Sequence, residues 1–436
     1  MILGASDKYF YYTSADSADF TISNRITIKN LDIRLFEQIA NDVLRFYPEF
    51  AYQPVIEDNK VTRHTNNRPL RFVSDKEKGD IRYRFGTKDT NYYLFYFIYG
   101  IDYVTFTHYH GMSDVIGMME YTRCVMYNYA KEIGFKFTKE ELEELIPTIR
   151  DRRVDFSSID EEDMLDPYNR YGDCRINPSY SYEHSGAFEI PTKQYPIEDD
   201  GFHYSLLTLR TDEVLALSKE IGVSVAPMMV DISALAIRRE YNAADKPVIA
   251  LLPVDYRKEF NSRTCVNFSD ATLIPVTQED ENLSMHDRCT KLKDIMRAQM
   301  SGEYMKFVAG SKAKQVEAFE NDNRTIEELS REKSAYTIGG FRPVTYGFTY
   351  PGKMSLLSGL DRMVEDIKCT VLTRGSALIG HSFLNEFRIQ ILCRNDEDIF
   401  SNCIAKAYRD LGLTASLVDY GKVYADKMIV DALEHR

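Results

Sequence analysis

The sequence predicts a mixed α/β protein with two lobes, and three observations carry this prediction. The chain has 436 residues, a length typical of about two to three domains. It is 44% hydrophobic and 28% charged, which is enough apolar side chain to bury substantial cores. Segments with helical and strand periodicity alternate in both halves, whereas residues 151–202 contain four prolines, many acids and no sustained period. We therefore expect an N-terminal lobe over residues 1–175, a linker or lid over 176–202 and a C-terminal lobe over 203–436.

Charge and composition exclude several classes of protein. The chain has 54 Lys and Arg against 67 Asp and Glu, a net charge of −13, so we expect no nucleic-acid partner. No run of about 18 apolar residues is present, so we expect no membrane span. The N-terminus lacks the features of a signal peptide, and the seven cysteines include no Cys-x-x-Cys pair. Scattered reduced thiols and a cytoplasmic location are the simplest interpretation.

The first half begins with a predicted amphipathic helix over residues 35–50, stopped by Pro48. Strand-like runs follow at 81–85, 90–99 and 102–110, and helical spacing resumes at 113–134.

The second half repeats this alternation of elements. We expect strands at 203–209, 246–257 and 386–394, and helices at 211–222, 224–241 and 398–412.

The segment THYHGMSDV, residues 107–115, is the candidate site of chemistry. If the strand extends to residue 110, His108 and His110 share one face with Val104 and Phe106. The chain then turns at Gly111 into a helix, which places an imidazole at a strand–helix junction, where a general base could act.

The same segment also has a purely structural interpretation. Ser113 or Asp114 could simply cap the helix, and the two histidines could be core or rim residues.

HGMSD (110–114), at the end of a strand and before an apolar helix, resembles the His-x-x-x-Asp signature of the chloramphenicol acetyltransferase-like superfamily. This superfamily includes coenzyme-A-dependent acyltransferases, alcohol acetyltransferases and the condensation domains of nonribosomal peptide synthetases. LLPVDYRKEFNSRTCVNFSDATLIPV (251–276) resembles a strand–loop of the same superfamily. VTYGFTYPG (344–352) lies where a loop bordering the active-site channel is expected.

The resemblance implies two chloramphenicol-acetyltransferase-like lobes, each a mixed sheet flanked by helices, with the active-site channel between them. His110 would then be the general base, and Asp114 the orienting carboxylate paired with Arg257. The channel candidates are Tyr109, Asn267, Tyr346 and Gly347; the Tyr346 hydroxyl or a backbone N–H near Gly347 could bind the oxyanion.

The expected reaction is transfer of an acyl group from a thioester to the hydroxyl or amine of a small molecule. Acyl-CoA is the preferred donor, and an acyl-carrier thioester is the other candidate. The thioester is a co-substrate and not a permanently bound cofactor. An acyl carrier protein is a further candidate partner.

The chain departs from the superfamily pattern in three places. Tyr109 replaces the first histidine of condensation domains, Val115 replaces a glycine, and a DFGWG-like motif is absent because the chain has no Trp. These departures favour a free-standing acyltransferase over a condensation domain. They also leave open a non-catalytic relative that binds an acyl carrier or another protein.

A metal-dependent hydrolase using His108, His110 and Asp114 is the second alternative. Two other motifs fail on their chemistry. GFTYPGKM (347–354) lacks the Ser or Thr of a phosphate-binding loop and has Pro351 without an N–H, and GHSFL (380–384) lacks the final glycine of a nucleophile elbow.

Overall fold

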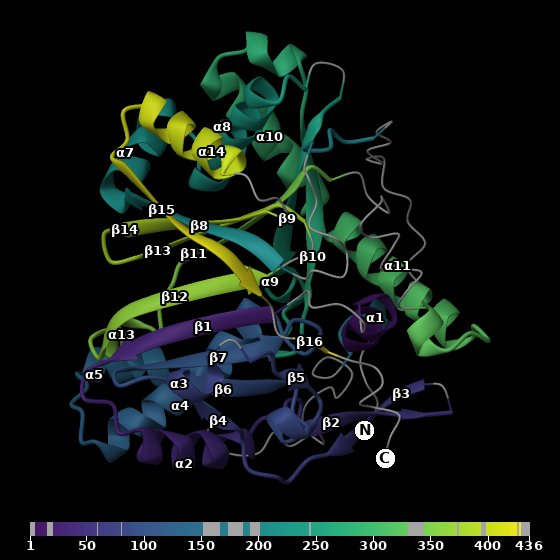
Figure 1. Cartoon of the computed structure of the whole chain (residues 1–436), viewed down its shortest axis with the longest axis vertical. Helices are drawn as coiled ribbons and strands as arrows, with labels where there is room; N and C mark the ends of the chain where they lie inside the picture. The colour runs from purple at the N-terminus through teal and green to yellow at the C-terminus, as the bar shows by residue number, and fades with distance from the viewer. Residues whose placement is uncertain are drawn as a thin grey trace.

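The computed structural model describes residues 5–14, 21–58, 60–79, 81–150, 166–172, 186–191, 201–243, 246–329, 344–372, 375–393, 398–424 and 427–428. Its main elements are two mixed β-sheets, one above the other in Figure 1, with helices packed on them. The two-lobed mixed α/β fold predicted from the sequence is confirmed.

The first sheet has five strands and belongs mainly to the N-terminal half. Only β4 and β6 run parallel in it, and the other neighbours are antiparallel. In spatial order the strands are β12 (Val364–Leu372), β1 (Thr21–Ile28), β7 (Tyr103–Tyr109), β6 (Phe95–Tyr99) and β4 (Phe72–Ser74).

The second sheet has seven strands from the C-terminal half, and β11 pairs parallel with both β9 and β13. In spatial order they are β10 (Ser269–Val276), β9 (Val248–Asp255), β11 (Tyr346–Lys353), β13 (Ala377–Phe383), β14 (Glu386–Cys393), β8 (Gly201–Arg210) and β15 (Ala415–Tyr424). Two small ribbons pair β2 (Tyr52–Glu57) with β3 (Lys60–Thr65) and β5 (Arg84–Phe85) with β16 (Lys427–Met428).

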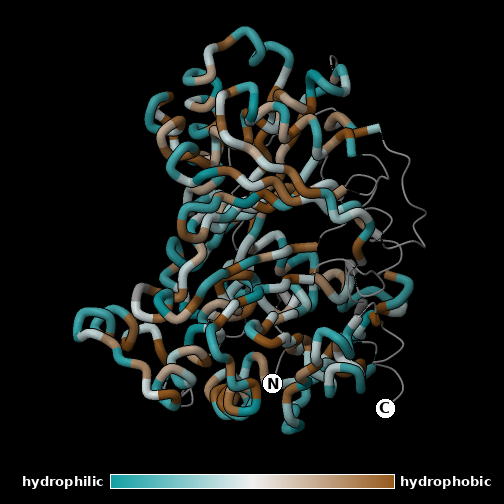
Figure 2. Tube along the Cα trace, turned by 60° about the vertical axis from the view of Figure 1, so that its left-hand side comes forward, coloured by the Kyte–Doolittle hydropathy of each residue, from teal (hydrophilic) through white to brown (hydrophobic). Residues whose placement is uncertain are grey.

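The longer helices bury apolar side chains against the sheets. One large core lies under the first sheet and also takes side chains from β8, β13 and β14, and a second core lies in the C-terminal half. Figure 2 shows hydrophobic segments running through the interior of both lobes. The helices are α1 (Ala5–Ser14), α2 (Ile33–Leu44), α3 (Asp75–Lys78), α4 (Val115–Glu132), α5 (Lys139–Leu145), α7 (Thr211–Ile221), α8 (Val225–Glu240), α9 (Arg257–Phe260), α10 (Met285–Gln299), α11 (Gly302–Glu320), α13 (Ser358–Asp361) and α14 (Ile399–Asp410). Short 3₁₀ turns lie at Lys88–Thr90, Ile146–Thr148, Asn169–Tyr171 and Glu279–Asn282.

Most of the predicted elements are present, but several bounds differ. The first predicted helix ends at Leu44, before Pro48, and only Arg84 and Phe85 of the run 81–85 form a strand. Residues 344–352, predicted as a loop, are mostly strand β11, inside the second sheet. Parallel pairing with β9 on one side and β13 on the other makes this segment a strand.

Two strands cross the predicted lobe boundaries. Strand β12 comes from the C-terminal half but pairs with β1 in the first sheet, and β16 pairs with β5. Most of the expected linker at 176–202 lies outside the described residues, so its role stays a prediction.

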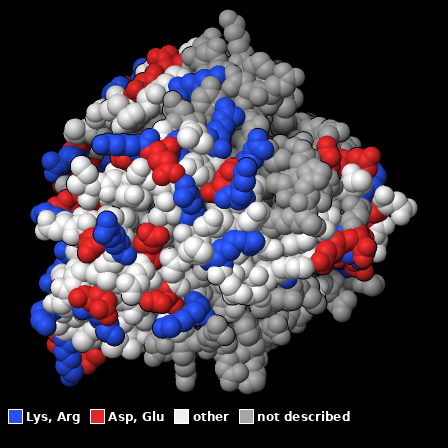
Figure 3. All heavy atoms as spheres, turned by 60° about the horizontal axis from the view of Figure 1, so that its bottom comes forward, with Lys and Arg blue, Asp and Glu red and all other residues white. Residues whose placement is uncertain are grey.

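Charges of both signs are interspersed over the described residues on the face drawn in Figure 3. Within the described ranges, no single helix is both long and apolar enough to cross a membrane. By length and composition alone, α7 and α8 pass that test together, as a pair bent by 92°.

Candidate active site

His110 lies at the junction predicted from the sequence, but one residue beyond the strand. Strand β7 ends at Tyr109, and the chain turns so that the Met112 N–H donates to the Tyr109 carbonyl at 3.0 Å. His110 is therefore the first residue of this turn, and its side chain is partly exposed. His108 lies within the strand and is fully buried, with Nε2 3.1 Å from the Ser113 carbonyl oxygen.

Asp114 is both the N-cap of α4 and an ion-pair partner. Its Oδ1 accepts from the Gly117 N–H at 2.9 Å, and its Oδ2 accepts from the Phe268 N–H at 3.0 Å. The Arg257 guanidinium donates to the same carboxylate, with Nη2 2.9 Å from Oδ2. One carboxylate thus makes both contacts expected from the sequence, the helix cap and the pairing with Arg257.

This environment fixes the charge of Asp114. Burial by itself raises the pKa of the carboxyl, but Arg257 and the N–H groups of Gly117 and Phe268 outweigh it, so the pKa lies below the ordinary 3.8. Arg257 is in turn held by the carbonyls of Thr264 and Val266, each accepting at 2.7 Å. The pair stays charged and connects the start of α4 to the loop between α9 and β10.

The start of α4 also docks directly onto this loop. The Ser113 hydroxyl donates to the Cys265 carbonyl at 2.6 Å. A Cβ added at Gly117 would lie 2.1 Å from the same carbonyl oxygen, so only glycine allows the approach. Sequence reasoning missed Gly117, and the only signal was a glycine in the first turn of a largely buried helix.

Asn267 contacts the candidate base directly. Its Nδ2 donates to the His110 carbonyl at 3.0 Å and lies 3.2 Å from Nδ1 of the imidazole. The Ser269 hydroxyl donates to Asn267 Oδ1 at 3.0 Å, which turns the amide nitrogen toward His110. Asn267, predicted as a channel residue, is buried and contacts the histidine.

The surroundings of His110 favour the neutral imidazole. Burial lowers its pKa below the ordinary 6.5, and Asp114 opposes this shift without reversing it. The ammonium of Lys312, paired with Asp270 at 2.9 Å, lowers the pKa further. A neutral imidazole near pH 7 is the form that can accept a proton.

The polar groups of the other predicted channel residues hydrogen-bond within the fold. Tyr346 is buried in the second core, where its hydroxyl donates to the Val230 carbonyl at 3.3 Å. The Gly347 N–H donates to the Ser376 carbonyl at 2.9 Å. Both donors are used by the fold, which argues against either as an oxyanion ligand. Tyr109 is 1% exposed, and its hydroxyl donates to the Phe10 carbonyl.

The described residues around His108, His110 and Asp114 do not form a metal-binding site. Both Asp114 oxygens accept hydrogen bonds from Arg257 or the backbone. Among the residues that the structure describes, no group of three His, Cys, Asp or Glu side chains is placed to hold a metal ion.

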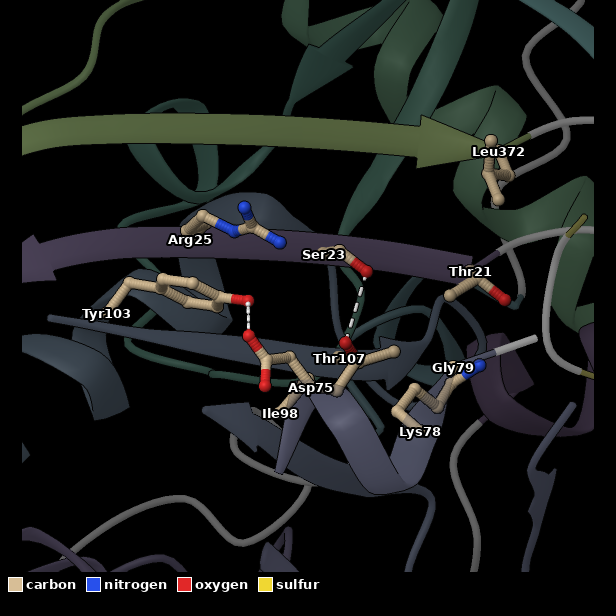
Figure 4. A pocket seen from close by; sticks show the side chains of 10 residues that line it. All are labelled: Thr21, Ser23, Arg25, Asp75, Lys78, Gly79, Ile98, Tyr103, Thr107 and Leu372. Carbon is tan, nitrogen blue, oxygen red and sulfur yellow. Dashed lines mark hydrogen bonds between the residues drawn. The ribbon is translucent and has the colours of Figure 1, made fainter. Parts of the chain in front are cut away.

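A separate polar pocket of about 310 Å³ lies against β1 and β7 (Figure 4). Ser23 and Thr107 share a hydrogen bond of 3.2 Å across it, and the Tyr103 hydroxyl donates to Asp75 at 3.1 Å. His110 is not among the residues lining this pocket.

Comparisons with known proteins identify the fold. No protein-family model and no curated protein sequence matches the chain. Among solved structures, TRI101 of F. sporotrichioides, complexed with coenzyme A and T-2, is 12% identical over 96% of this chain and 99% of its own, with a TM-score of 0.61. Polyketide synthase associated protein 5 from Mycobacterium tuberculosis is 13% identical over 94% and 96%, with a TM-score of 0.54.

The condensation domain of the monacolin K polyketide synthase MokA is also similar, at 11% identity over 94% of this chain and 96% of that domain, with a TM-score of 0.60. At such identities the likeness shows the fold, which is the two-lobed fold of the chloramphenicol acetyltransferase-like proteins and condensation domains.

Proposed function

We propose that this protein is an acyltransferase that moves an acyl group from a thioester to the hydroxyl or amine of a small molecule. The observation that carries the proposal is the anchoring of His110 at the lobe junction. Asp114 and Arg257 fix the start of α4, and Asn267 contacts both the carbonyl and the ring of the histidine. Acyl-CoA is the proposed donor, because TRI101, which has this fold, is complexed with coenzyme A.

The chemistry needs one group that accepts and returns a proton. The neutral imidazole of His110 takes the proton of the acceptor as its oxygen or nitrogen attacks the thioester carbonyl carbon. The C–S bond then breaks, and the departing thiolate takes the proton back from the imidazolium. Asp114 takes no part in proton transfer, because Arg257 and two N–H groups hold it ionised.

Thiol release in the presence of an acyl-CoA panel and candidate alcohols and amines tests the proposal. Release should require an acceptor, and His110→Ala should lower turnover by about 10²–10⁴-fold. His64→Ala, an exposed histidine on β3, is the matched control and should keep full turnover. Tight binding of an acyl carrier without any turnover would instead support the non-catalytic alternative.

A further inference from the structure

Helix α1 covers the candidate base. The rings of Phe10 and His110 are stacked, with centroids 5.3 Å apart and planes 27° apart. The Phe10 carbonyl accepts a hydrogen bond from the Tyr109 hydroxyl at 3.2 Å, so the helix is attached at the end of the catalytic strand. One face of the imidazole is thereby occupied by the protein itself.

The other side of α1 is attached to α11, which lies next to it in Figure 1. Lys8 forms an ion pair of 2.5 Å with Glu320, the last residue of α11. Tyr9 and Tyr12 pack against Phe319, with ring centroids 6.5 and 5.7 Å apart. Helix α1 therefore bridges the N-terminal lobe and a helix of the C-terminal half.

The ion pair of Lys8 and Glu320 is the attachment that a single charge substitution can disrupt. The side chains of Lys8 and Glu320 are 14% and 21% exposed, so the pair is enclosed yet within reach of water. An enclosed pair at this distance is stronger than a fully exposed one, because solvent screens it less. Reversing one charge turns the attraction into repulsion and leaves the rest of the helix unchanged.

We propose that α1 is a gate over one face of His110, latched by the pair of Lys8 and Glu320, and that it must move before a substrate reaches that face of the imidazole. The purpose of the gate rests on the proposed function, but its existence does not. Accessibility of His110 is a property of the folded protein and can be measured without any substrate.

Labelling with diethyl pyrocarbonate, which modifies accessible neutral imidazoles, measures this accessibility in the full chain. Fragmentation of the labelled peptide separates His110 from His108, which is fully buried and reports on the integrity of the core. His64, whose side chain is 47% exposed, gives the reactivity of an open histidine. In the wild-type protein, His110 should label at least about tenfold more slowly than His64, because the labelling rate scales with the open population.

Two variants open the gate by different routes. Lys8→Glu breaks the latch, and Phe10→Ala removes the stacked ring; each should raise the rate at His110 by at least about fivefold while His108 stays protected. The double variant Lys8→Glu/Glu320→Lys restores opposite charges and should restore protection. Lys139→Glu is the matched control, because it breaks an exposed pair with Glu143 on α5 and should leave the rate unchanged.

The outcomes separate cleanly. Labelling of wild-type His110 as fast as His64, or no rise in either variant, overturns the gate. An equal rise at His108 in both variants also overturns it, because the lobe itself would then have opened. Acyl transfer without protection of His110 would keep the proposed function and remove the gate, whereas protection without transfer would do the reverse.

Discussion

The guanidinium of Arg257 lies 2.9 Å from Oδ2 and 3.0 Å from Oδ1 of Asp114, although 143 residues separate the two in the chain. Asp114 is 6% exposed and the Arg257 side chain 10% exposed, so the pair is shielded from solvent. Because Asp114 also caps α4, the pair sets the position of the turn that carries His110.

The first prediction is a strong energetic coupling within this pair. Asp114→Ala and Arg257→Ala should each lower the free energy of unfolding by about 3–5 kcal/mol. The first leaves the shielded guanidinium with only Asp255, 2.7 Å away and 38% exposed, and the second leaves the buried Asp114 carboxylate without its cation. The double variant should be destabilised by clearly less than the sum. Chemical denaturation of the four proteins measures the coupling. The control is a double-mutant cycle on Lys406 and Asp410, an exposed pair in α14, whose two changes in unfolding free energy should nearly add up. If the changes at Asp114 and Arg257 also add up, the coupling is refuted.

The second prediction concerns the pH dependence of His110. Burial lowers its pKa, so the acid limb of kcat/KM should lie below pH 6.5, where the base becomes protonated. Asn267→Asp places a carboxylate beside the ring, which stabilises the imidazolium and should move the limb up by about 1–2 units.

An NMR titration of the His110 ring checks the same shift without a substrate. Asn267→Ala serves as the control, because it removes the contact without adding a charge and should not reproduce this rise. An unchanged titration in Asn267→Asp would show that Asn267 does not control the base.

The third prediction tests the close approach of α4 to the Cys265 carbonyl. Gly117→Ala should lower the free energy of unfolding by about 1–3 kcal/mol, because the new methyl group must displace backbone. Ile116→Ala, on the exposed side of the same helix, should change it by less than about 0.5 kcal/mol. Thermal unfolding compares the two variants. Equal stabilities would mean that the loop carrying Cys265 moves aside without lowering the stability of the fold.

The fourth prediction links stability to acid through His108. Burial lowers its pKa to about 3, whereas an unfolded histidine titrates near 6.5. Between these values only the unfolded chain binds the proton, so the free energy of unfolding should fall as the pH drops from 6.5 toward 3.

His108→Gln keeps a side-chain N–H for the Ser113 carbonyl and cannot titrate in this range. Between pH 6.5 and 3, the free energy of unfolding should therefore fall less steeply in this variant than in the wild type. The difference between the two slopes should be about 1.4 kcal/mol per pH unit. Above pH 7 the two curves should run parallel, which is the internal control. Curves that stay parallel below pH 6 would exclude His108 as a source of acid sensitivity.

Local patterns sufficed to predict the site residues that lie on or next to strong periodic segments. The strand before His110, the helix after Asp114 and the strand before Arg257 all have clear periodicity, and the structure brings these three elements together. The resemblance of HGMSD to a known signature supplied the pairing, which periodicity alone cannot provide.

What could not be predicted depends on contacts between distant segments. The role of Asn267 follows from the amide orientation set by Ser269, and the need for Gly117 follows from a carbonyl in another lobe. The resemblance alone predicts a loop over residues 344–352, whereas most of this segment is strand β11. Its assignment comes from pairing with two strands that precede and follow it in the chain.

The position of β12 has a consequence for how the protein is made. Thr21 of β1 pairs with Leu372 of β12, so one edge of the first sheet stays open until the ribosome has passed residue 372. Such distant pairing raises contact order and slows folding, and it leaves the backbone groups of β1 exposed meanwhile. A fragment that ends before β12 would keep this edge open permanently and invite aggregation. The first sheet is thus completed only by a strand from the C-terminal half.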